Sequence, residues 1–594
     1  MLTLPLCGAP ALSGLFATAA LVFAAPPYSV KIEHGVPVTM RDGTVLRADI
    51  YRPDTSNERF PVLLQRTPYN KSGGTSFGYE GAQQGLVVII QDVRGRYTSQ
   101  GDWYPFRYES QDGYETVEWA ASLPYSDGKV GMFGGSYVGA TQMLAAIAHP
   151  PHLAGICPVV TASNYHENWT YQGGAFEQWF NESWTSGLAQ DTLNRLVQKH
   201  TNAMEGAWTL PLTAYPLFNF NHALAKDDLT SAIAPYFLDW LNHPNYDEYW
   251  KRWSIEEHFP DINVPALTIA AWYDIFQGGS IRNYLGIKAH GGSEAARTGQ
   301  HLLITIGGHA GSGRKIGEVD FGPAAAEFNE DAITLRWYEH LFKGAQNEFA
   351  NSKPVRIFVM GDNIWRDESE WSVARAREQR YFLHATRGAN SVRGDGSLSA
   401  TAPGPESSDR YVYDPSKPVP TIGGPLCCDS EHLAPGPRDQ RPIEAREDVL
   451  VYSTPPLTED LEVTGPVRVE LYAESSQADT DFTGKLVDLW PNGFAQNLTE
   501  GIIRARYRDS REAPQMMTPG QVYNFTIDLW STSNVFKKGH VLRLEISSSN
   551  FPRFDRNLNT GEAAATARIA VPASNTVLHD AEHPSALVVQ VVPK

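Results

Sequence analysis

Cysteine is scarce in this sequence, and the spacings that hold metal ions or phosphates are missing. The chain has four cysteines among 594 residues, at positions 7, 157, 427 and 428. Cys427 and Cys428 are adjacent, a spacing that rarely closes a disulfide, so we expect no disulfide framework. No paired C-x-x-C or H-E-x-x-H segment occurs, and the run GSGRKIG at residues 311–317 fits neither glycine-rich phosphate-binding fingerprint. We therefore predict no metal, no nucleotide and no other cofactor.

Positive charge and long apolar runs are also in short supply. The 49 Lys and Arg residues stand against 67 Asp and Glu residues, which gives a formal net charge of −18. An acidic surface repels phosphate backbones and anionic membranes, so nucleic acid is excluded as a partner. After residue 25, no run approaches the roughly 18 uncharged apolar residues of a membrane span.

The N-terminus resembles an export signal in one respect and departs from it in another. Residues 11–25 (ALSGLFATAALVFAA) form an apolar stretch of the length typical of a signal peptide. Residues 1–10 contain no Lys or Arg, whereas a signal normally starts with basic residues. We expect residues 1–25 to be a signal peptide and the protein to be secreted or periplasmic; a cytoplasmic protein is the alternative.

The hydrophobic pattern divides the chain into three kinds of segment. At 594 residues the chain is too long for a single core, so two or three domains are expected. Residues 30–163 and 255–367 alternate apolar strands with helical patterns, which predicts a mostly parallel sheet covered by helices. Residues 164–254 hold seven of the fifteen tryptophans and no convincing strand, which indicates a helical insertion. Residues 368–594 begin with a stretch rich in Gly, Pro and Ser and continue as many short strands, which favours an antiparallel sandwich or jelly roll.

Individual elements can be placed within these segments. In the split α/β domain we expect strands at 38–40, 45–51, 62–65, 86–91, 130–133, 266–272 and 302–306, and helices at 109–123 and 327–342. In the C-terminal part we expect strands at 467–472, 483–489, 522–529 and 541–547.

A serine lies where a strand passes directly into a helix. The run VGMFGGSYVG at residues 130–139 leads into an apolar helical pattern, which is typical of a nucleophile elbow. Gly134 and Gly139 would leave space where a Cβ would clash, and the Oγ of Ser136 would be exposed at the helix N-terminus. The match is G-x-S-x-x-G, because Val138 stands where the second glycine is usual. An ordinary helix cap is the alternative interpretation.

A serine hydroxyl needs a base, and the base needs a group that orients it. In this kind of fold the order along the chain is Ser, then Asp or Glu, then His, each placed after a strand. Asp274 follows the strand pattern at 267–273, and His309 follows the pattern at 302–308. A histidine taken at random from the seventeen would more often be structural, so position alone singles out His309.

Several segments together resemble the cocaine esterase and X-prolyl dipeptidyl-peptidase family, which includes α-amino acid ester hydrolases. The resemblance runs from about residue 30 to the C-terminus. The matching segments are MRDG (40–43), RTPYNK (66–71), QDVRG (91–95), GMFGGSYVG (131–139), WYD (272–274), STSNVF (531–536) and SSSNFP (547–552).

This resemblance implies an α/β-hydrolase fold with a helical cap at 164–254 and a C-terminal jelly roll; a carbohydrate-binding module is the alternative for the last part. It implies that Ser136 is the nucleophile, His309 the general base and then acid, and Asp274 the orienting carboxylate. The oxyanion hole would use the backbone N–H of Tyr137 and the phenol of Tyr69. Without the resemblance, Tyr69 in its Pro-Tyr-Asn turn reads as a packed loop aromatic. The family histidine usually follows Gly-Pro-Trp, whereas two glycines precede His309 here, so a displaced histidine stays open.

The function expected from these features is hydrolysis of a small-molecule carboxylic ester, or an amide, through an acyl-enzyme on Ser136. The alternatives are an X-Pro dipeptidyl-peptidase, an α-amino acid ester hydrolase or acylase, and a non-catalytic binding protein. Phe276 and Gln277 follow Asp274 and carry no charge, so we expect acyl groups without a free α-amine. Glu167 or Glu177, at the start of the cap, could supply the missing negative charge.

Overall fold

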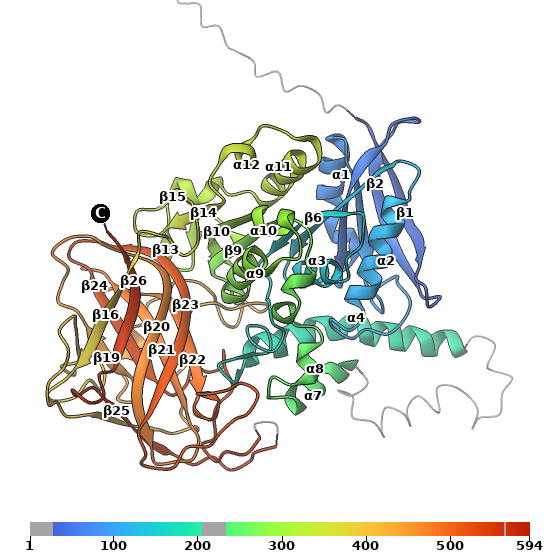
Figure 1. Cartoon of the computed structure of the whole chain (residues 1–594). Helices are drawn as coiled ribbons and strands as arrows, with labels where there is room; N and C mark the ends of the chain where they lie inside the picture. The colour runs from blue at the N-terminus through green and yellow to red at the C-terminus, as the bar shows by residue number, and fades with distance from the viewer. Residues whose placement is uncertain (1–27, 205–232, 310, 564–565, 594) are drawn as a thin grey trace, which may run out of the picture.

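A mixed sheet of eleven strands forms the frame of the first part of the molecule (Figure 1). The computed structural model describes residues 28–204, 233–309, 311–563 and 566–593, so the predicted signal peptide lies outside the described residues. The strand order is β1-β2-β4-β3-β5-β6-β9-β10-β14-β15, with β11 paired to β10. The strands are β1 (Val30–Thr39), β2 (Val45–Pro53), β3 (Phe60–Thr67), β4 (Val87–Asp92), β5 (Ser126–Gly135), β6 (Leu153–Val159), β9 (Ala266–Tyr273), β10 (Gln300–Gly308), β11 (Gly311–Ser312), β14 (Val355–Val359) and β15 (Ile364–Glu368). From β4 to β14 all neighbours in this order are parallel, whereas β1, β2 and β15 pair antiparallel at the edges.

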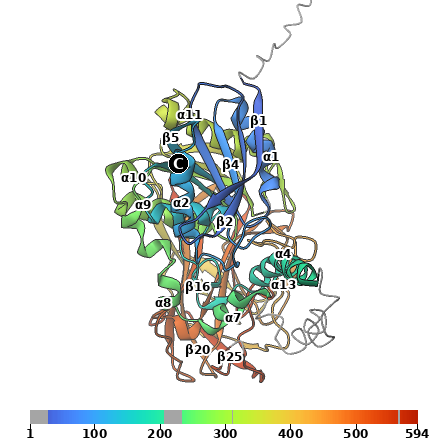
Figure 2. The ribbon, with the colours of Figure 1, turned by 90° about the vertical axis from the view of Figure 1, so that its right-hand side faces the viewer.

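Helices cover both faces of this sheet (Figure 2). Helices α2 (Glu109–Ala121) and α3 (Tyr137–Ile147) pack on the face that includes Leu64 and Met132. Helices α1 (Thr75–Gln83) and α11 (Glu330–Lys343) pack on the other face, with Leu63 and Phe133. Because both faces are buried, the central strands read as continuous apolar runs; every residue of β4 is buried.

The segment between β6 and β9 is mostly helical and rich in stacked rings. It contains α4 (Gln178–Met204), α7 (Pro235–Asn242) and α8 (Glu248–Lys251). Trp169, Trp184 and Trp240 are buried and pack ring against ring, with centroids about 6 Å apart. One expectation was wrong in detail, because a short hairpin, β7 (Tyr171–Gln172) and β8 (Ala175–Phe176), occurs here. Strands of two residues around a Gly-Gly turn are too short to leave an alternating pattern.

A second sheet of eleven strands, mostly antiparallel, forms the C-terminal part, shown in yellow to red in Figure 1. The fold class predicted from the sequence, an α/β domain followed by a mostly β domain, is confirmed. The strands are β16 (Arg377–His384), β17 (Ser397–Ser399), β18 (Asp409–Tyr413), β19 (Leu450–Ser453), β20 (Leu461–Ser475), β21 (Asp481–Leu489), β22 (Ala495–Arg504), β23 (Tyr523–Phe536), β24 (Val541–Ser547), β25 (Ala573–Leu578) and β26 (Ala586–Val592).

The helical segment is fastened to this second domain by polar contacts. The backbone N–H of Phe176 donates to Asp555 (2.8 Å), and that of Trp179 donates to the carbonyl of Pro552 (3.0 Å). The fully buried Arg553 donates to Gln172 (3.0 Å) and to Glu500 (2.6 Å). A buried guanidinium needs such partners, so these bonds fix how the two parts meet.

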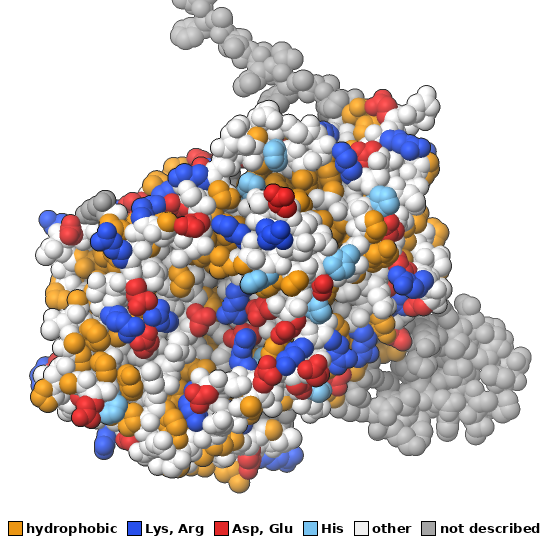
Figure 3. Space-filling view, viewed as in Figure 1, with side chains coloured by type: hydrophobic (Ala, Val, Ile, Leu, Met, Phe, Trp, Pro, Cys, Tyr) orange, Lys and Arg blue, Asp and Glu red, His pale blue; other side chains and the backbone are white. Residues whose placement is uncertain are grey.

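Charge of both signs is present on the face of the molecule in Figure 3. On the face shown in Figure 3, acidic and basic side chains are interspersed. Among the described residues, no helix combines the length and apolar character that crossing a membrane requires.

Candidate active site

Ser136 occupies a sharp turn between β5 and α3. Its backbone has φ 62° and ψ −129°, a conformation that is rare for a residue with a side chain and that clusters at functional sites. The neighbouring glycines make the turn possible: a Cβ on Gly134 would lie 2.5 Å from Val138, and one on Gly139 would lie 2.7 Å from Thr161. The strand, the turn and the helix thus lie where the sequence analysis placed them.

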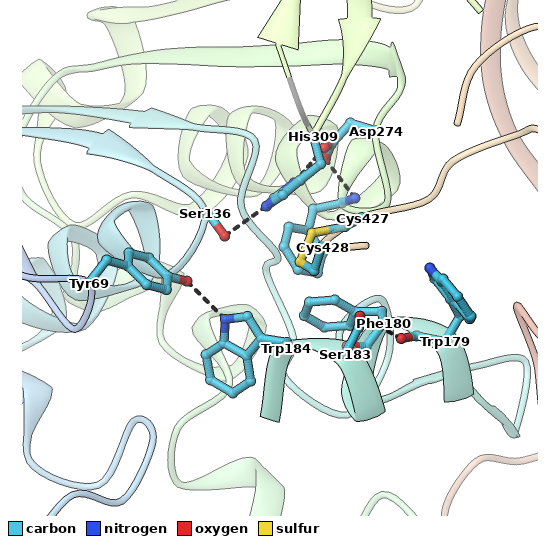
Figure 4. Close-up of a disulfide and its surroundings, with 11 residues drawn as sticks. Tyr69, Ser136, Trp179, Phe180, Ser183, Trp184, Asp274, His309, Cys427 and Cys428 are labelled. Atoms are coloured by element: carbon cyan, nitrogen blue, oxygen red, sulfur yellow. Dashed lines mark hydrogen bonds and ion pairs between the residues drawn. A yellow bond between two sulfur atoms is a disulfide. The ribbon is translucent and has the colours of Figure 1, made fainter. Parts of the chain in front are cut away.

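Three side chains from three loops meet at this turn (Figure 4). Asp274 directly follows β9 and is fully buried, and His309 directly follows β10. Nδ1 of His309 lies 2.7 Å from Oδ2 of Asp274, and Nε2 lies 2.8 Å from Oγ of Ser136. The backbone N–H of Phe276 donates to the other oxygen of Asp274 (2.7 Å). With Nδ1–H donating to Asp274, Nε2 is free to accept the serine proton, which is what general-base catalysis requires.

The phenol of Tyr69 lies on the other side of Ser136 (Figure 4). The indole N–H of Trp184, on α4, donates to the Tyr69 oxygen (2.9 Å). Although Tyr69 as a whole is 39% exposed, desolvation of its hydroxyl raises the pKa of Tyr69, while hydrogen bonding with Trp184, Ser136 and the backbone N–H of Tyr137 opposes that rise. The phenol therefore keeps its proton at neutral pH and can act as a donor. The same contacts place it next to the N–H of Tyr137.

Tyr137 is held in place by its own side chain. Its hydroxyl donates to Glu109 on α2 (3.0 Å) and accepts from the backbone N–H of Phe106 (2.8 Å). Glu109 in turn pairs with the fully buried Arg66 (2.6 Å). These bonds fix the first turn of α3, so the backbone N–H of Tyr137 has a defined direction.

The segment after Asp274 provides an aromatic wall and an anchor. The ring of Phe276 stands edge-on to His309, with centroids 5.2 Å apart, and stacks on Trp169 at 4.4 Å. Gln277 points away: its amide N–H donates to the carbonyl of Ser531 (2.5 Å), and its oxygen accepts from the N–H of Ser531 (3.1 Å). On the strand side, the Tyr273 hydroxyl donates to the carbonyl of Asn497 (2.9 Å). The C-terminal domain thus holds the Asp274 segment on both sides.

The two carboxylates at the start of the cap are already paired. Glu167 accepts from the backbone N–H of Gly173 (3.0 Å) and lies 3.9 Å from Arg511. Glu177 lies 3.6 Å from Arg553, and burial raises the pKa of Glu177 to about 7. Both nearby cations are arginines of the C-terminal domain, and among the described residues Oε2 of Glu167 and Oε1 of Glu177 have no hydrogen-bond partner.

The expectation that Cys427 and Cys428 form no bond was wrong, because the structure joins them in a disulfide. The expectation rested on the short distance between neighbouring Cα atoms, here 3.7 Å. Cys428 adopts φ 77°, a left-handed conformation that is rare for a residue with a side chain. Together with His309 the disulfide lines a cavity of about 340 Å³. Sequence reasoning missed this element, as it missed the bond between Trp184 and Tyr69.

Asp92 and Arg94, from the matching segment QDVRG, organise loops instead of the site. Arg94 donates to Asp112 (2.7 and 2.8 Å) and to Asp42 (2.7 Å), and Asp92 accepts from the backbone N–H of Lys71 (2.8 Å). Within the described ranges, no cluster of His, Cys, Asp and Glu is suited to hold a metal ion.

The sheet order and the Ser-His-Asp geometry define a serine hydrolase of the α/β class. Residues 42–311 match the X-Pro dipeptidyl-peptidase (S15) family, and residues 347–588 match the X-Pro dipeptidyl-peptidase C-terminal non-catalytic domain. The chain is 36% identical over 581 residues to a cocaine esterase from Rhodococcus sp. (strain MB1 Bresler), which covers 95% of this chain and 99% of the relative. The chain therefore belongs to the cocaine esterase and X-Pro dipeptidyl-peptidase family.

Other similar proteins agree with this assignment. A putative serine esterase from Mycobacterium bovis is 26% identical over 601 residues, covering 87% of this chain and 90% of the relative. Two solved structures share the fold over nearly the whole length at 24% identity. An aminopeptidase from a marine sediment Thaumarchaeota archaeon has a TM-score of 0.78 and covers 96% of this chain and 97% of its own. An α-amino acid ester hydrolase has a TM-score of 0.76 and covers 98% of this chain and 100% of its own. The protein is a serine hydrolase that cleaves esters, and X-Pro dipeptidyl-peptidase activity also fits the family.

Proposed function

We propose that this protein hydrolyses carboxylic esters whose acyl group is apolar or aromatic and carries no free α-amine, with Ser136 as the nucleophile. The observation that carries the proposal is the uncharged aromatic wall of Phe276 beside His309. An apolar acyl group packs favourably on such a wall, whereas a desolvated ammonium group needs a fixed counter-charge.

The mechanism begins with attack of the Ser136 oxygen on the ester carbonyl. His309 takes the hydroxyl proton at Nε2, and Asp274 stabilises the imidazolium through the bond at Nδ1. The carbonyl oxygen becomes an oxyanion, which accepts hydrogen bonds from the phenol of Tyr69 and the N–H of Tyr137. His309 then gives its proton to the departing alcohol, and an acyl group remains on Ser136.

The second half of the cycle repeats these steps with water. His309 removes a proton from a water molecule, whose oxygen attacks the acyl carbonyl. The second tetrahedral oxyanion uses the same two donors. Collapse of this second tetrahedral intermediate releases the carboxylic acid and returns the proton to Ser136. The reaction therefore needs no cofactor.

The rival reaction, release of dipeptides from an amino terminus, requires binding of the substrate's ammonium group. The sequence analysis named Glu167 and Glu177 as carboxylates that could bind this ammonium group. Both lie within 4 Å of an arginine, Arg511 or Arg553, which supports the ester assignment because a nearby guanidinium disfavours binding of a second cation.

The test compares kcat/KM for p-nitrophenyl butyrate, a phenylglycine methyl ester and a glycyl-prolyl anilide under the same conditions. We expect the butyrate to be the best substrate. Faster turnover of the two substrates that carry a free amine would overturn the neutral-pocket proposal in favour of the peptidase or amino-ester reaction. A fluorophosphonate probe tests the chemistry itself, because a protein that never labels at Ser136 would be a binding protein and not an enzyme.

A further inference from the structure

The Cys427–Cys428 disulfide lies in a loop of the C-terminal domain, beside His309 (Figure 4). At the base of this loop, the backbones of Gly424 and Gly436 exchange two hydrogen bonds (2.8 and 2.9 Å). Among the described residues, no hydrogen bond ties positions 425–435 to another segment. Above its base, the loop is therefore restrained by side-chain packing and by the disulfide.

The two halves of the disulfide have different surroundings. Cys427 is 6% exposed and belongs to the same hydrophobic cluster as Phe276 and Trp169, in the catalytic domain and the cap. Cys428 is exposed. One cysteine is thus packed into the core beside the site, and the other lies at the surface.

The disulfide is also part of the wall of the site. Figure 4 shows it next to His309, on the side away from Tyr69. The cavity of about 340 Å³ is lined by His309 and by loop residues that are mostly apolar, namely Leu426, Cys427, Cys428, Leu433 and Pro435. His309 also contacts Ser136 at 2.8 Å, so we place the far end of a large acyl group on Ser136 in this cavity.

We propose that Cys427–Cys428 is a thiol–disulfide exchange site that sets acyl-group selectivity, and that a dithiol reductant is its reaction partner. This inference rests on the proposed function of Ser136 and His309. A thiolate of the reductant attacks the exposed sulfur of Cys428, the sulfur–sulfur bond breaks, and Cys427 leaves as a thiolate that takes up a proton. The second thiol of the reductant then attacks the mixed disulfide, closes the reductant's own disulfide and releases Cys428 as a thiol. The protein gains two electrons and two protons, and the dithiol is oxidised.

Reduction changes the wall of the cavity in a defined way. After reduction the two sulfur atoms are no longer bonded, so they must move apart at least to van der Waals distance. Cys428 has a left-handed backbone (φ 77°), which residues with a side chain rarely adopt, and cleavage of the sulfur–sulfur bond removes one restraint on it. The loop wall therefore shifts, and a large acyl group loses contacts that a small one never makes.

The test uses the full-length protein with p-nitrophenyl benzoate and p-nitrophenyl acetate, before and after anaerobic reduction by dithiothreitol. We expect the benzoate-to-acetate ratio of kcat/KM to fall about tenfold on reduction, the size of effect that a few lost apolar contacts produce. Removal of dithiothreitol and oxidation by glutathione disulfide should restore the ratio. Iodoacetamide and mass spectrometry should find the two cysteines blocked from alkylation before reduction and alkylated after it.

Matched variants separate this disulfide from other thiols. The double variant Cys427→Ser, Cys428→Ser should have the low ratio permanently and ignore dithiothreitol. The variants Cys157→Ala and Cys7→Ser should respond as the unaltered protein does; Cys157 is a buried free thiol on β6. A thermal melt would reveal whether the double variant folds. If it does not fold, the change in the ratio on reduction of the unaltered protein still tests the proposal.

Two results would overturn the proposal: an unchanged ratio although both cysteines are alkylated after reduction, or two free thiols in the untreated protein. Fluorophosphonate labelling of Ser136 distinguishes the possible failures. Normal labelling with an unchanged ratio refutes only the exchange site, whereas absent labelling in both states refutes the proposed function itself.

Discussion

Replacing Trp184 by phenylalanine tests whether the cap takes part in catalysis through Tyr69. The substitution removes the indole N–H that donates to the phenol oxygen at 2.9 Å but leaves an aromatic ring in the cap. A neutral hydrogen bond contributes about 1 kcal/mol net, so kcat should fall about fivefold if the bond orients the phenol toward the oxyanion. KM should change little, because the loss is specific to the transition state.

The size of the effect should depend on Tyr69. Tyr69→Phe removes an oxyanion donor and should lower kcat by about a hundredfold. In that background Trp184→Phe should change kcat less than about twofold, since no phenol remains to be oriented; the coupling energy would be about 1 kcal/mol.

The assay is steady-state hydrolysis of p-nitrophenyl butyrate by the unaltered protein, both single variants and the double variant. Trp179→Phe is the matched control, because Trp179 lies on the same helix and its indole nitrogen has no hydrogen-bond partner among the described residues. Equal losses from Trp184→Phe in both backgrounds would refute the reasoning and assign the effect to packing. An unchanged kcat in Tyr69→Phe would remove Tyr69 from the oxyanion hole.

Further predictions concern the triad, acid stability and export. Ser136→Ala and His309→Ala should each fold normally and lower kcat by roughly a millionfold; near-normal turnover by His309→Ala would exclude it as the base. Burial lowers the pKa of His166 to about 4, below the value of about 6.5 in an unfolded chain, so the unfolded chain takes up this proton first. The free energy of unfolding should therefore fall by about 3 kcal/mol between about pH 6.5 and pH 4, and His166→Gln should lose that part of the pH dependence, as denaturant titrations at several pH values would reveal. We also propose that residues 1–25 direct export; a mature protein that retains Met1 and stays in the cytoplasm would contradict this.

Much of the α/β frame could be predicted because buried parallel strands leave a strong signal. β4 is buried along its whole length and appears in the sequence as the apolar run at 86–91. The turn at Ser136 could also be predicted from the sequence, because it needs glycines on both sides where a Cβ would clash. Asp274 and His309 could be proposed from chain order, because each follows a strand.

The remaining features depend on contacts between distant segments. Tyr69 in a Pro-Tyr-Asn turn carries no sign of catalysis, and only the family resemblance selected it. Its bond to Trp184 joins residues 115 positions apart, a relation that no local pattern records. The bond between Cys427 and Cys428 occurs together with a left-handed backbone at Cys428, a conformation that the residue type does not predict.

The anchoring of the Asp274 segment has a consequence for recombination between relatives of this protein. Gln277 and Tyr273 bond to Ser531 and Asn497, so residues outside the α/β domain position the carboxylate that orients His309. These partners are backbone groups, so a foreign C-terminal half can replace this one only if its main chain lies in the same place at positions 497 and 531. A hybrid should therefore be judged by the fit of the backbone at these two positions before its overall sequence identity.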